Sequence, residues 1–305
     1  MVDTRMTLST ASPFRLDLTS WALRRREKNA VDRWDGRQYT RVIVVGTSPV
    51  RLTVIQETTS AEPVLVVSLH PEADDQIRED ARLLVQKILG LTVDLQPFYV
   101  LAHDNELLRP LVEQFSGVRP PRFPSVFEAL VNSIACQQVT LDLGIILLNR
   151  LSERFGPSVD DQGTIQHGFP APTDLAEADE ETIRQLGFSH QKARAIRELA
   201  ADVVDERLDL ACLDSMTNSE AVDYLSTIRG IGRWSAEYVL LRGLGRLDTF
   251  PGDDIGAQNN LQRLFHLVDR PNYEQIRELT SRWHPYEGLV YFHLLLEKLQ
   301  TKGAL

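Results

Sequence analysis

Two glycines and a pair of aspartates carry the clearest chemical signal in this sequence. Gly230 and Gly232 flank one isoleucine, and Asp253 and Asp254 follow in a Pro-Gly loop about one helix later. Because glycine has no Cβ, the backbone can turn tightly there and come close to a phosphate. The free N–H groups at the start of the next helix favour the same anion. A backbone site that binds a phosphate, followed by a carboxylate, is suited to chemistry on a base that has been extruded from DNA.

Helices are expected on both sides of the glycine pair. Upstream, Thr217 and Glu220 have the spacing of a capping box, and apolar residues then recur at helical spacing. Downstream, Ser235 is predicted to cap a second helix. A glycine pair also occurs in plain helix connections, so the helical patterns around it are what favour a helix-hairpin-helix unit.

The residues in and around this unit resemble one family. The chain is similar to the helix-hairpin-helix DNA glycosylases with a Gly/Pro-rich loop and an aspartate (HhH-GPD), and within them to the bacterial 3-methyladenine DNA glycosylase II (AlkA-like) branch. The similarity extends over nearly the whole chain, and the hairpin followed by the aspartate loop is its most specific part. The matching segments are residues 230–236 with Tyr238, 250–254, 127–131, 137–140, 192–196, and 34–36 with Tyr39.

The resemblance implies a monofunctional enzyme that hydrolyses the bond between a purine and its sugar. It assigns the catalytic role to Asp254, whose carboxylate would stabilise an oxocarbenium-like sugar and help to activate water. Asp253 has a competing claim, with capping of the next helix as its alternative role. In relatives that also cut the strand, the lysine that forms a Schiff base stands where this chain has Trp234. The resemblance gives Lys192 and Lys298 no such role, so no AP lyase activity is expected.

Two aromatic residues of the second hairpin helix are predicted to form the base pocket. Trp234 and Tyr238 are four positions apart and therefore lie on one helix face, although core packing is an alternative for each. Stacking on these rings would favour an alkylated purine, which carries positive charge, by about 0.5–2 kcal/mol. Such a base is also a good leaving group, which agrees with the lack of a histidine suited to act as general acid.

The resemblance also implies how double-stranded DNA with a damaged base would be held. Gln138 stands where relatives place a side chain that fills the gap left by the flipped nucleotide, although an exposed loop residue is an equal alternative. A sodium or potassium ion is expected on hairpin carbonyls, whereas no iron-sulfur cluster or other cofactor is expected. The residues assigned to DNA binding are Gly230, Gly232, Arg233, Ser235, Ala236 and Gln138, and those assigned to the cation are Ser226, Ile228 and Ile231.

The lesion that the pocket accepts is less sharply defined. Glu287 stands where the family usually has an arginine, and Leu295 stands where a relative has a pocket tryptophan, so the pocket is expected to be wider or differently selective. One alternative is a glycosylase for oxidised or deaminated purines, and another is a non-catalytic protein that binds DNA structure. His266, His284 and His293 lack metal-ligand spacing and are interpreted as structural.

Composition limits these alternatives. The net charge of −10 over 305 residues argues against a protein that coats DNA, but residues 229–246 hold four arginines against one glutamate and predict a local basic surface. The second basic run, residues 24–26 with Lys28, is interpreted as surface. Cys136 and Cys212 are too few for a disulfide framework, an iron-sulfur cluster or a cysteine-rich alkyl-transfer module, and both are interpreted as core residues. No signal peptide or membrane-spanning segment is apparent, so we expect a cytoplasmic monomer.

An α+β fold is predicted. Alternating apolar residues around Leu16, the Asp35-Gly36 turn and the β-branched runs at 50–55 and 64–69 indicate an antiparallel sheet, followed by a helix over 72–90. The remainder reads as helices, with Ser125 and Glu128 as a second capping box and residues 156–172 as a loop. By resemblance, residues 1–91 form the sheet domain, residues 92–122 plus 247–305 form the lobe with the catalytic Asp loop, and residues 123–246 form the lobe that ends in the helix-hairpin-helix.

Overall fold

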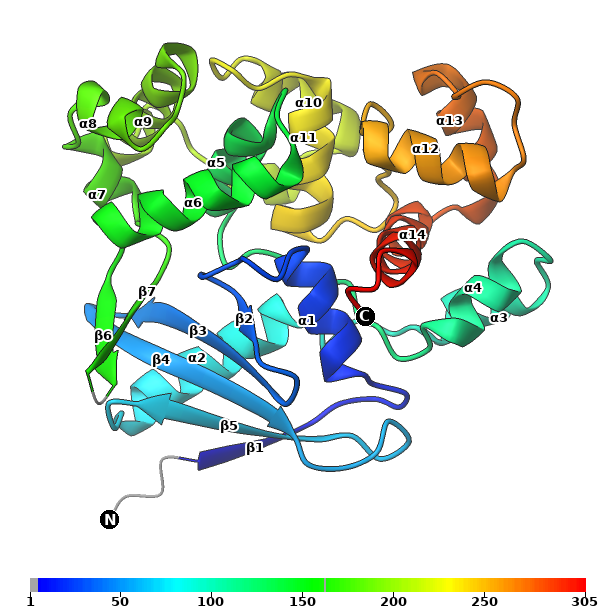
Figure 1. Cartoon of the computed structure of the whole chain (residues 1–305), viewed down its shortest axis with the longest axis horizontal. Coiled ribbons are helices and arrows are strands. Elements are labelled where there is room, and N and C mark those ends of the chain that lie inside the picture. Colours follow the sequence, from blue (N-terminus) through cyan, green and yellow to red (C-terminus); the bar gives the residue numbers. More distant parts are fainter. Residues whose placement is uncertain (1–4, 162) are drawn as a thin grey trace.

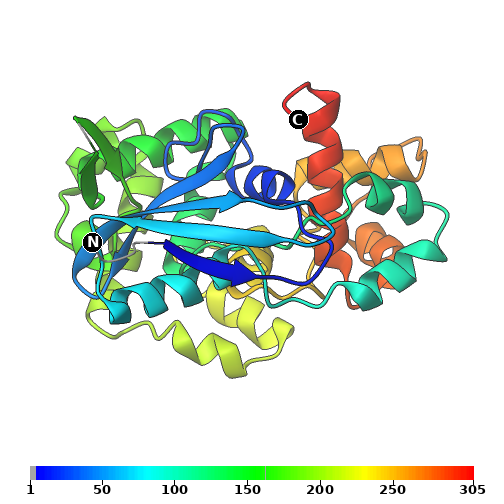
Figure 2. The same cartoon turned by 90° about the horizontal axis from the view of Figure 1, so that it is seen from below.

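A five-stranded antiparallel sheet forms one end of the molecule in the computed structural model, which describes residues 5–161 and 163–305. The strand order is β1-β5-β4-β3-β2, and each neighbouring pair is antiparallel (Figure 2). The strands are β1 (Arg5–Ser9), β2 (Arg33–Trp34), β3 (Gln38–Val45), β4 (Ser48–Gln56) and β5 (Val64–His70). The predicted α+β fold is therefore confirmed.

Local turn chemistry explains why this sheet was predictable. Asp35 Oδ1 accepts the backbone N–H groups of Arg37 and Gln38, both at 2.9 Å, and Gly36 adopts φ +98°. Glycine is favoured in that conformation, so β2 and β3 are joined as predicted. The alternation around Leu16 was misread, because these residues form helix α1 (Leu16–Arg24). A short apolar run fits either period, and here the helix buries Leu16, Leu18, Ala22 and Leu23.

Helices build the rest of the chain, apart from a small hairpin that the sequence interpretation missed. Residues 156–172 contain β6 (Ser158–Asp161) and β7 (Thr164–His167), which extend beside the large sheet (Figure 1). Arg33 Nη1 donates to Gln166 at 2.8 Å and fastens this hairpin to β2. The helices are α2 (Asp75–Ile88), α3 (Gln96–His103), α4 (Leu108–Gln114), α5 (Val126–Cys136), α6 (Leu141–Phe155), α7 (Pro172–Ala176), α8 (Glu180–Gln185), α9 (His190–Val204), α10 (Asn218–Ser226), α11 (Arg233–Val239), α12 (Ile255–Leu264), α13 (Tyr273–Thr280) and α14 (Glu287–Thr301).

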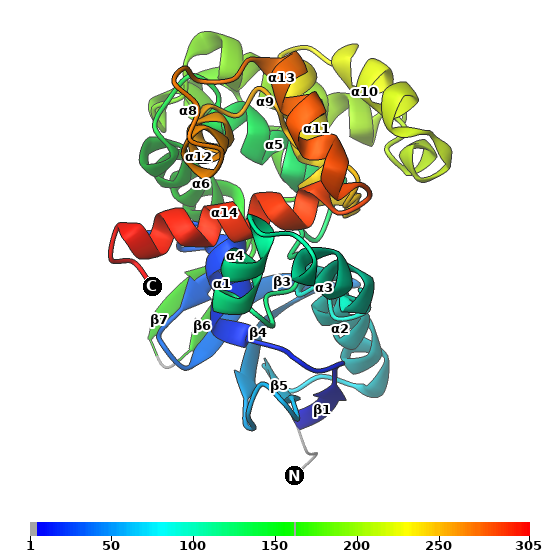
Figure 3. The ribbon, with the colours of Figure 1, turned by 90° about the vertical axis from the view of Figure 1, so that its right-hand side faces the viewer.

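Two clusters of buried apolar side chains connect these elements. One joins the sheet and α2 to the helices from α5 to α11, and the other joins α3 and α4 to α12, α13 and α14. Helix α1 contributes to both clusters. Figure 3 shows α14 running between the sheet with α1, α2 and α3 on one side and the helices from α9 to α13 on the other. The second cluster joins residues far apart in sequence, as the two-part lobe requires, while the domain boundaries themselves remain a prediction.

Among the described residues, no helix is both long and apolar enough to cross a membrane.

Candidate active site

The connection between α10 and α11 is a tight hairpin. Gly230 adopts φ +82°, and the Ile231 N–H donates to the Ile228 carbonyl at 3.0 Å. A Cβ at Gly230 would lie 3.2 Å from the Cβ of Ala195, whereas a Cβ at Gly232 would meet nothing within 4 Å. Gly230 is therefore needed for the turn. Gly232, which has no side chain, leaves the N–H groups at the start of α11 accessible to an anion.

The caps of these helices differ partly from expectation. The capping box of Thr217 and Glu220 is present at the start of α10, as predicted. Ser235 does not cap α11, because Gly232 is the N-cap and Ser235 lies buried inside the helix. The Ser235 hydroxyl instead accepts from Gln137 Nε2 at 2.8 Å, and the same amide donates to the Gly230 carbonyl at 2.7 Å. Gln137 thus ties the α5–α6 turn to the hairpin, a role that the sequence did not indicate.

Asp254 is both the N-cap of α12 and a wall of the main cavity. Its Oδ1 accepts from the Ala257 N–H at 2.8 Å, and its Oδ2 accepts from the Tyr291 hydroxyl at 3.3 Å. The cap role suggested for Asp253 is wrong, since the cap is one residue later. Asp253 instead pairs with Arg233 at 2.8 Å. Burial raises the pKa of Tyr291 well above its ordinary value, so its hydroxyl keeps the proton that it donates to Asp254.

A second carboxylate holds the Pro-Gly loop that carries Asp254. Glu237, on α11, accepts from the Gly252 N–H at 3.1 Å and from the Tyr273 hydroxyl at 2.5 Å. Burial raises the pKa of Glu237. The Arg233 guanidinium stacks 3.5 Å from the centre of the Tyr273 ring. These contacts join the hairpin helix directly to the loop and fix the carboxylate relative to the hairpin.

The cavity beside Asp254 has a volume of about 1000 Å³. It lies between the α5–α6 turn, α11, the start of α12 and α14, and it is large enough for a purine with its sugar. Trp234, Tyr238, Gln138 and Asp254 all line it, whereas the other predicted DNA and cation residues lie outside its lining. The lining residues are Arg25, Arg26, Cys136, Gln137, Gln138, Val139, Thr140, Leu141, Leu143, Trp234, Tyr238, Asp253, Asp254, Ile255, Gly256, Ala257, Asn260, Tyr291, Leu295, Lys298 and Leu299.

The two predicted aromatic residues form one wall. The rings of Trp234 and Tyr238 stack with centroids 5.5 Å apart and an interplanar angle of 30°. Trp234 is half-buried, but Tyr238 is only 2% exposed and contributes mainly as support behind it. Tyr291, which the sequence did not indicate, adds a third aromatic ring to the cavity lining.

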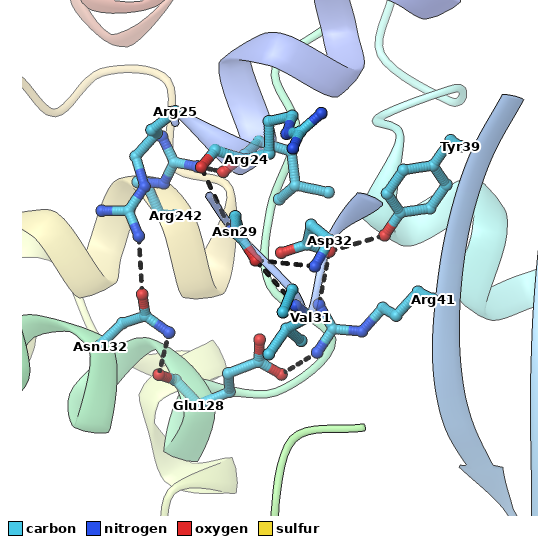
Figure 4. A network of polar contacts seen from close by, with 12 residues as sticks. Arg24, Arg25, Asn29, Val31, Asp32, Tyr39, Arg41, Glu128, Asn132 and Arg242 are labelled. Atoms are coloured by element: carbon cyan, nitrogen blue, oxygen red, sulfur yellow. Dashed lines mark hydrogen bonds and ion pairs between the residues drawn. The ribbon is translucent and has the colours of Figure 1, made fainter. Parts of the chain in front are cut away.

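The arginine run at 24–26 was interpreted wrongly as surface. Arg24 and Arg25 are 4% and 5% exposed. Arg24 Nη1 donates to the Trp34 carbonyl at 2.6 Å. Arg25 lines the cavity and donates to Asn132, as Figure 4 shows. Three consecutive arginines look like a solvated surface in sequence, and nothing local shows that α1 ends there and turns the second one inward.

Comparison with known proteins agrees with this geometry. The sequence profile of the HhH-GPD superfamily of base excision DNA repair proteins matches residues 131–285, half of the chain. The chain belongs to the HhH-GPD superfamily. The DNA-3-methyladenine glycosylase of Bacillus subtilis is 28% identical over 274 residues, covering 88% of this chain and 89% of the relative. DNA-3-methyladenine glycosylase 2 of Escherichia coli is 30% identical over 178 residues, covering 58% and 60%.

A solved structure extends the comparison to the whole fold. The 3-methyladenine DNA-glycosylase from Archaeoglobus fulgidus superposes with a TM-score of 0.84 at 27% identity, covering 95% of this chain and 97% of that one. The N-terminal sheet is therefore shared with that HhH-GPD glycosylase as well as the helices.

Gln138, the residue predicted to enter DNA, lies in the turn between α5 and α6. It is exposed at the cavity rim, with φ +53°. Lys192 holds this turn, because its amine donates to the carbonyls of Ala135 at 2.9 Å and Gln137 at 2.7 Å. The turn therefore presents Gln138 on a supported backbone, while its role as a wedge remains a prediction.

The arginines near the hairpin form less of a basic surface than their number suggests. Arg242 is fully buried and donates to the carbonyls of Ala22 and Leu23. Arg229 pairs with Glu198 at 2.8 Å, and Arg246 donates to Asn218. The interpretation of all four as a local positive surface is thus wrong for Arg242, because charge counts ignore burial.

The two residues that depart from the family pattern separate in the structure. Leu295 lines the cavity, where a smaller side chain than tryptophan leaves more room. Glu287 is not part of the lining. Its Oε1 lies 3.0 Å from Nδ1 of His284, within hydrogen-bonding distance. Among residues 5–161 and 163–305, no cluster of three His, Cys, Asp or Glu side chains has the arrangement of a metal site.

Proposed function

We propose that this chain is a monofunctional DNA glycosylase that removes alkylated purines of the 3-methyladenine and 7-methylguanine type by hydrolysis in base excision repair. The names of the relatives support the substrate class. The observation that carries the proposal is Asp254, fixed by Ala257 and Tyr291 on the wall of a cavity that also holds Trp234.

In the proposed reaction, Asp254 acts on the sugar. As the bond from C1′ to the purine breaks, positive charge develops on the ring, and a carboxylate close to it lowers the barrier. The same carboxylate orients the water that attacks C1′. Because Asp254 Oδ1 is held by the helix cap, the carboxylate keeps its orientation during the reaction.

The base would stack on Trp234, the more accessible of the two stacked rings. An alkylated purine carries positive charge within its nucleoside, so its attraction to the ring face is about 0.5–2 kcal/mol. When the bond breaks, the electron pair goes to the base, which leaves neutral. The pocket therefore needs no general acid for this class of lesion.

DNA would be held at the hairpin, with Gln138 entering the gap left by the flipped nucleotide. Gly232, Ser235 and Ala236 would present the start of α11 to a phosphate. A sodium or potassium ion would be held by the carbonyls of Ser226, Ile228 and Ile231. The Ile228 carbonyl accepts the Ile231 N–H and has a second lone pair that a cation would use.

The monofunctional assignment rests on Trp234, which occupies the position of the lyase lysine. The structure adds one amine to consider. Lys192 is engaged by two carbonyls, but Lys298 lines the cavity, and burial lowers the pKa of its amine. Borohydride trapping on an abasic duplex tests this directly. We expect no covalent complex, and a complex that disappears in Lys298→Ala would overturn the assignment.

The main test uses duplexes that each hold one defined lesion, incubated with the protein and analysed before and after alkali. We expect cleavage only after alkali, and fastest for the alkylated purines. Fastest release of an oxidised or deaminated purine would favour the alternative substrate class. Tight binding of abasic DNA without release of any base would favour the non-catalytic alternative. The cytoplasmic location and the monomeric state stay predictions.

A further inference from the structure

Arg25 occupies a backbone conformation that favours glycine. It follows the last residue of α1, adopts φ +60°, and donates its N–H to the Trp21 carbonyl at 2.9 Å. A side chain in the left-handed region costs stability, and such costs persist mainly where the side chain has a function.

The Arg25 side chain lines the cavity and has no counter-ion within residues 5–161 and 163–305. Its Nη1 donates to the Tyr238 hydroxyl at 2.8 Å, and its Nη2 donates to Asn132 Oδ1 at 2.7 Å. Nε is shielded from solvent and has no hydrogen-bond partner among the described residues. No carboxylate in the described part of the chain forms an ion pair with Arg25, although the residue is only 5% exposed. An unpaired buried charge is costly, so this arrangement suits a ligand that brings negative charge.

A chain of polar contacts holds Arg25 in place. Asn132 Nδ2 donates to the carbonyl of Glu128, and the Glu128 carboxylate pairs with Arg41 at 2.5 Å (Figure 4). Arg41, on β3, also pairs with Asp32 at 2.7 Å. Glu128 therefore does not complete the predicted capping box with Ser125, since its side chain turns to Arg41 instead. The sheet domain is thus connected to the wall of the cavity.

We propose that Arg25 is a specificity-determining residue that contacts the flipped base and promotes the departure of purines that are uncharged in DNA, because the negative charge that suits Arg25 develops on such a base as its bond to the sugar breaks. This inference rests on the proposed glycosylase function. When the bond from C1′ to N9 breaks, its electron pair goes to N9, so an uncharged purine leaves with negative charge. The Arg25 guanidinium stabilises that negative charge through its own positive charge and through hydrogen bonding. A cationic alkylated purine leaves neutral, so it gains nothing from Arg25 and is repelled by it.

The test compares two duplexes that differ in one base, 7-methylguanine or hypoxanthine, in single-turnover reactions with saturating enzyme. Arg25→Gly removes the side chain and suits the backbone, so the variant is expected to fold. We expect release of hypoxanthine to slow about 10- to 100-fold, the effect of losing one charge-assisted hydrogen bond. Release of 7-methylguanine is expected to stay within a few-fold or to rise. Arg25→Lys should recover part of the loss.

Two further variants control for folding and backbone effects. Arg25→Gln removes the charge but keeps an amide that can bond to Tyr238 or Asn132, and it should show the same selective loss. Glu206→Gly relieves a similar backbone conformation, φ +57°, at an exposed residue outside the cavity lining and should leave both rates unchanged.

The outcomes separate this inference from the proposed function. An equal fall on both duplexes, or no fall on either, would show that Arg25 does not select the leaving group and would overturn the inference. If the wild-type protein released hypoxanthine but no 7-methylguanine, the proposed alkylpurine function would fail, while the hypoxanthine rates of the variants would still decide the role of Arg25. A wild-type protein inactive on both duplexes would overturn both.

Discussion

Replacing Asp254 separates two roles that one side chain combines in this structure. Its Oδ1 caps α12 through the Ala257 N–H at 2.8 Å, while Oδ2 accepts from Tyr291, and the carboxylate is proposed to act on the sugar. Asparagine is as good a cap as aspartate, so Asp254→Asn keeps the first role and removes the charge. Alanine removes both.

Charge stabilisation and helix capping by Asp254 contribute different amounts of free energy. A carboxylate about 4 Å from a developing unit charge contributes roughly 4 kcal/mol at an effective dielectric constant near 20. Loss of that energy slows the chemical step by about a thousandfold. Loss of the cap costs about 1 kcal/mol, or about 2 °C in Tm for a chain of this size. We therefore expect Asp254→Asn to lose about a thousandfold in rate with nearly unchanged Tm, and Asp254→Ala to lose the same rate and about 2 °C.

The assay is single-turnover release of 7-methylguanine, with thermal unfolding and binding to an abasic-site duplex measured on the same preparations. Both variants should still bind the abasic duplex. Asp253→Asn is the matched control, since it removes the half-exposed pair with Arg233 and should slow release only several-fold. If Asp254→Asn released the base at the wild-type rate, or if Asp253→Asn were the inactive variant, the assignment would be refuted.

Three further predictions test other parts of the molecule. Trp234→Ala should slow release of 7-methylguanine about fivefold in single turnover, because about 1 kcal/mol of cation–π stacking is lost; an unchanged rate would remove Trp234 from the pocket. Gln138→Gly should raise the unfolding free energy by about 1 kcal/mol, since φ +53° suits glycine, and should weaken binding to abasic DNA in fluorescence anisotropy; unchanged binding would contradict the wedge. Burial lowers the pKa of His293 to about 4, so its neutral form stabilises the fold above about pH 6.5 and up to roughly 3 kcal/mol is lost as pH falls toward 4. Denaturant unfolding at a series of pH values should show this fall of the unfolding free energy in the wild type and a smaller fall in His293→Phe. An equal fall in both proteins would refute the lowered pKa of His293.

The parts of the fold that were predictable have local causes. The β2–β3 turn is specified by Asp35 and Gly36, and the α10 start by Thr217 and Glu220, all within a few residues. Helix α1 was misread because a short apolar run has no unique period. The β6–β7 hairpin was missed because its strands are four residues each and are fastened by contacts with the large sheet.

The candidate site was likewise predictable only in part. Asp254 and Gln138 were predicted from the resemblance and Trp234 from helical spacing, and the structure places all three on one cavity. Tyr291 and Arg25 were not found, because they reach the cavity from α14 and from the end of α1, far away in the sequence. Charge counting also misjudged Arg25 and Arg242, since sequence gives the sign of a charge but not its burial.

The position of Asp254 explains why the hairpin and the aspartate keep a fixed relation. Helix α11 bears Glu237, whose carboxylate binds the Gly252 N–H, so the helix that follows the glycines also holds the loop that presents the aspartate. The start of α12 then binds Oδ1 through the backbone N–H of Ala257. A carboxylate fixed in this way needs no reorganisation when charge develops on the sugar. The N-cap that stabilises α12 is thus also what orients the group proposed to act on C1′.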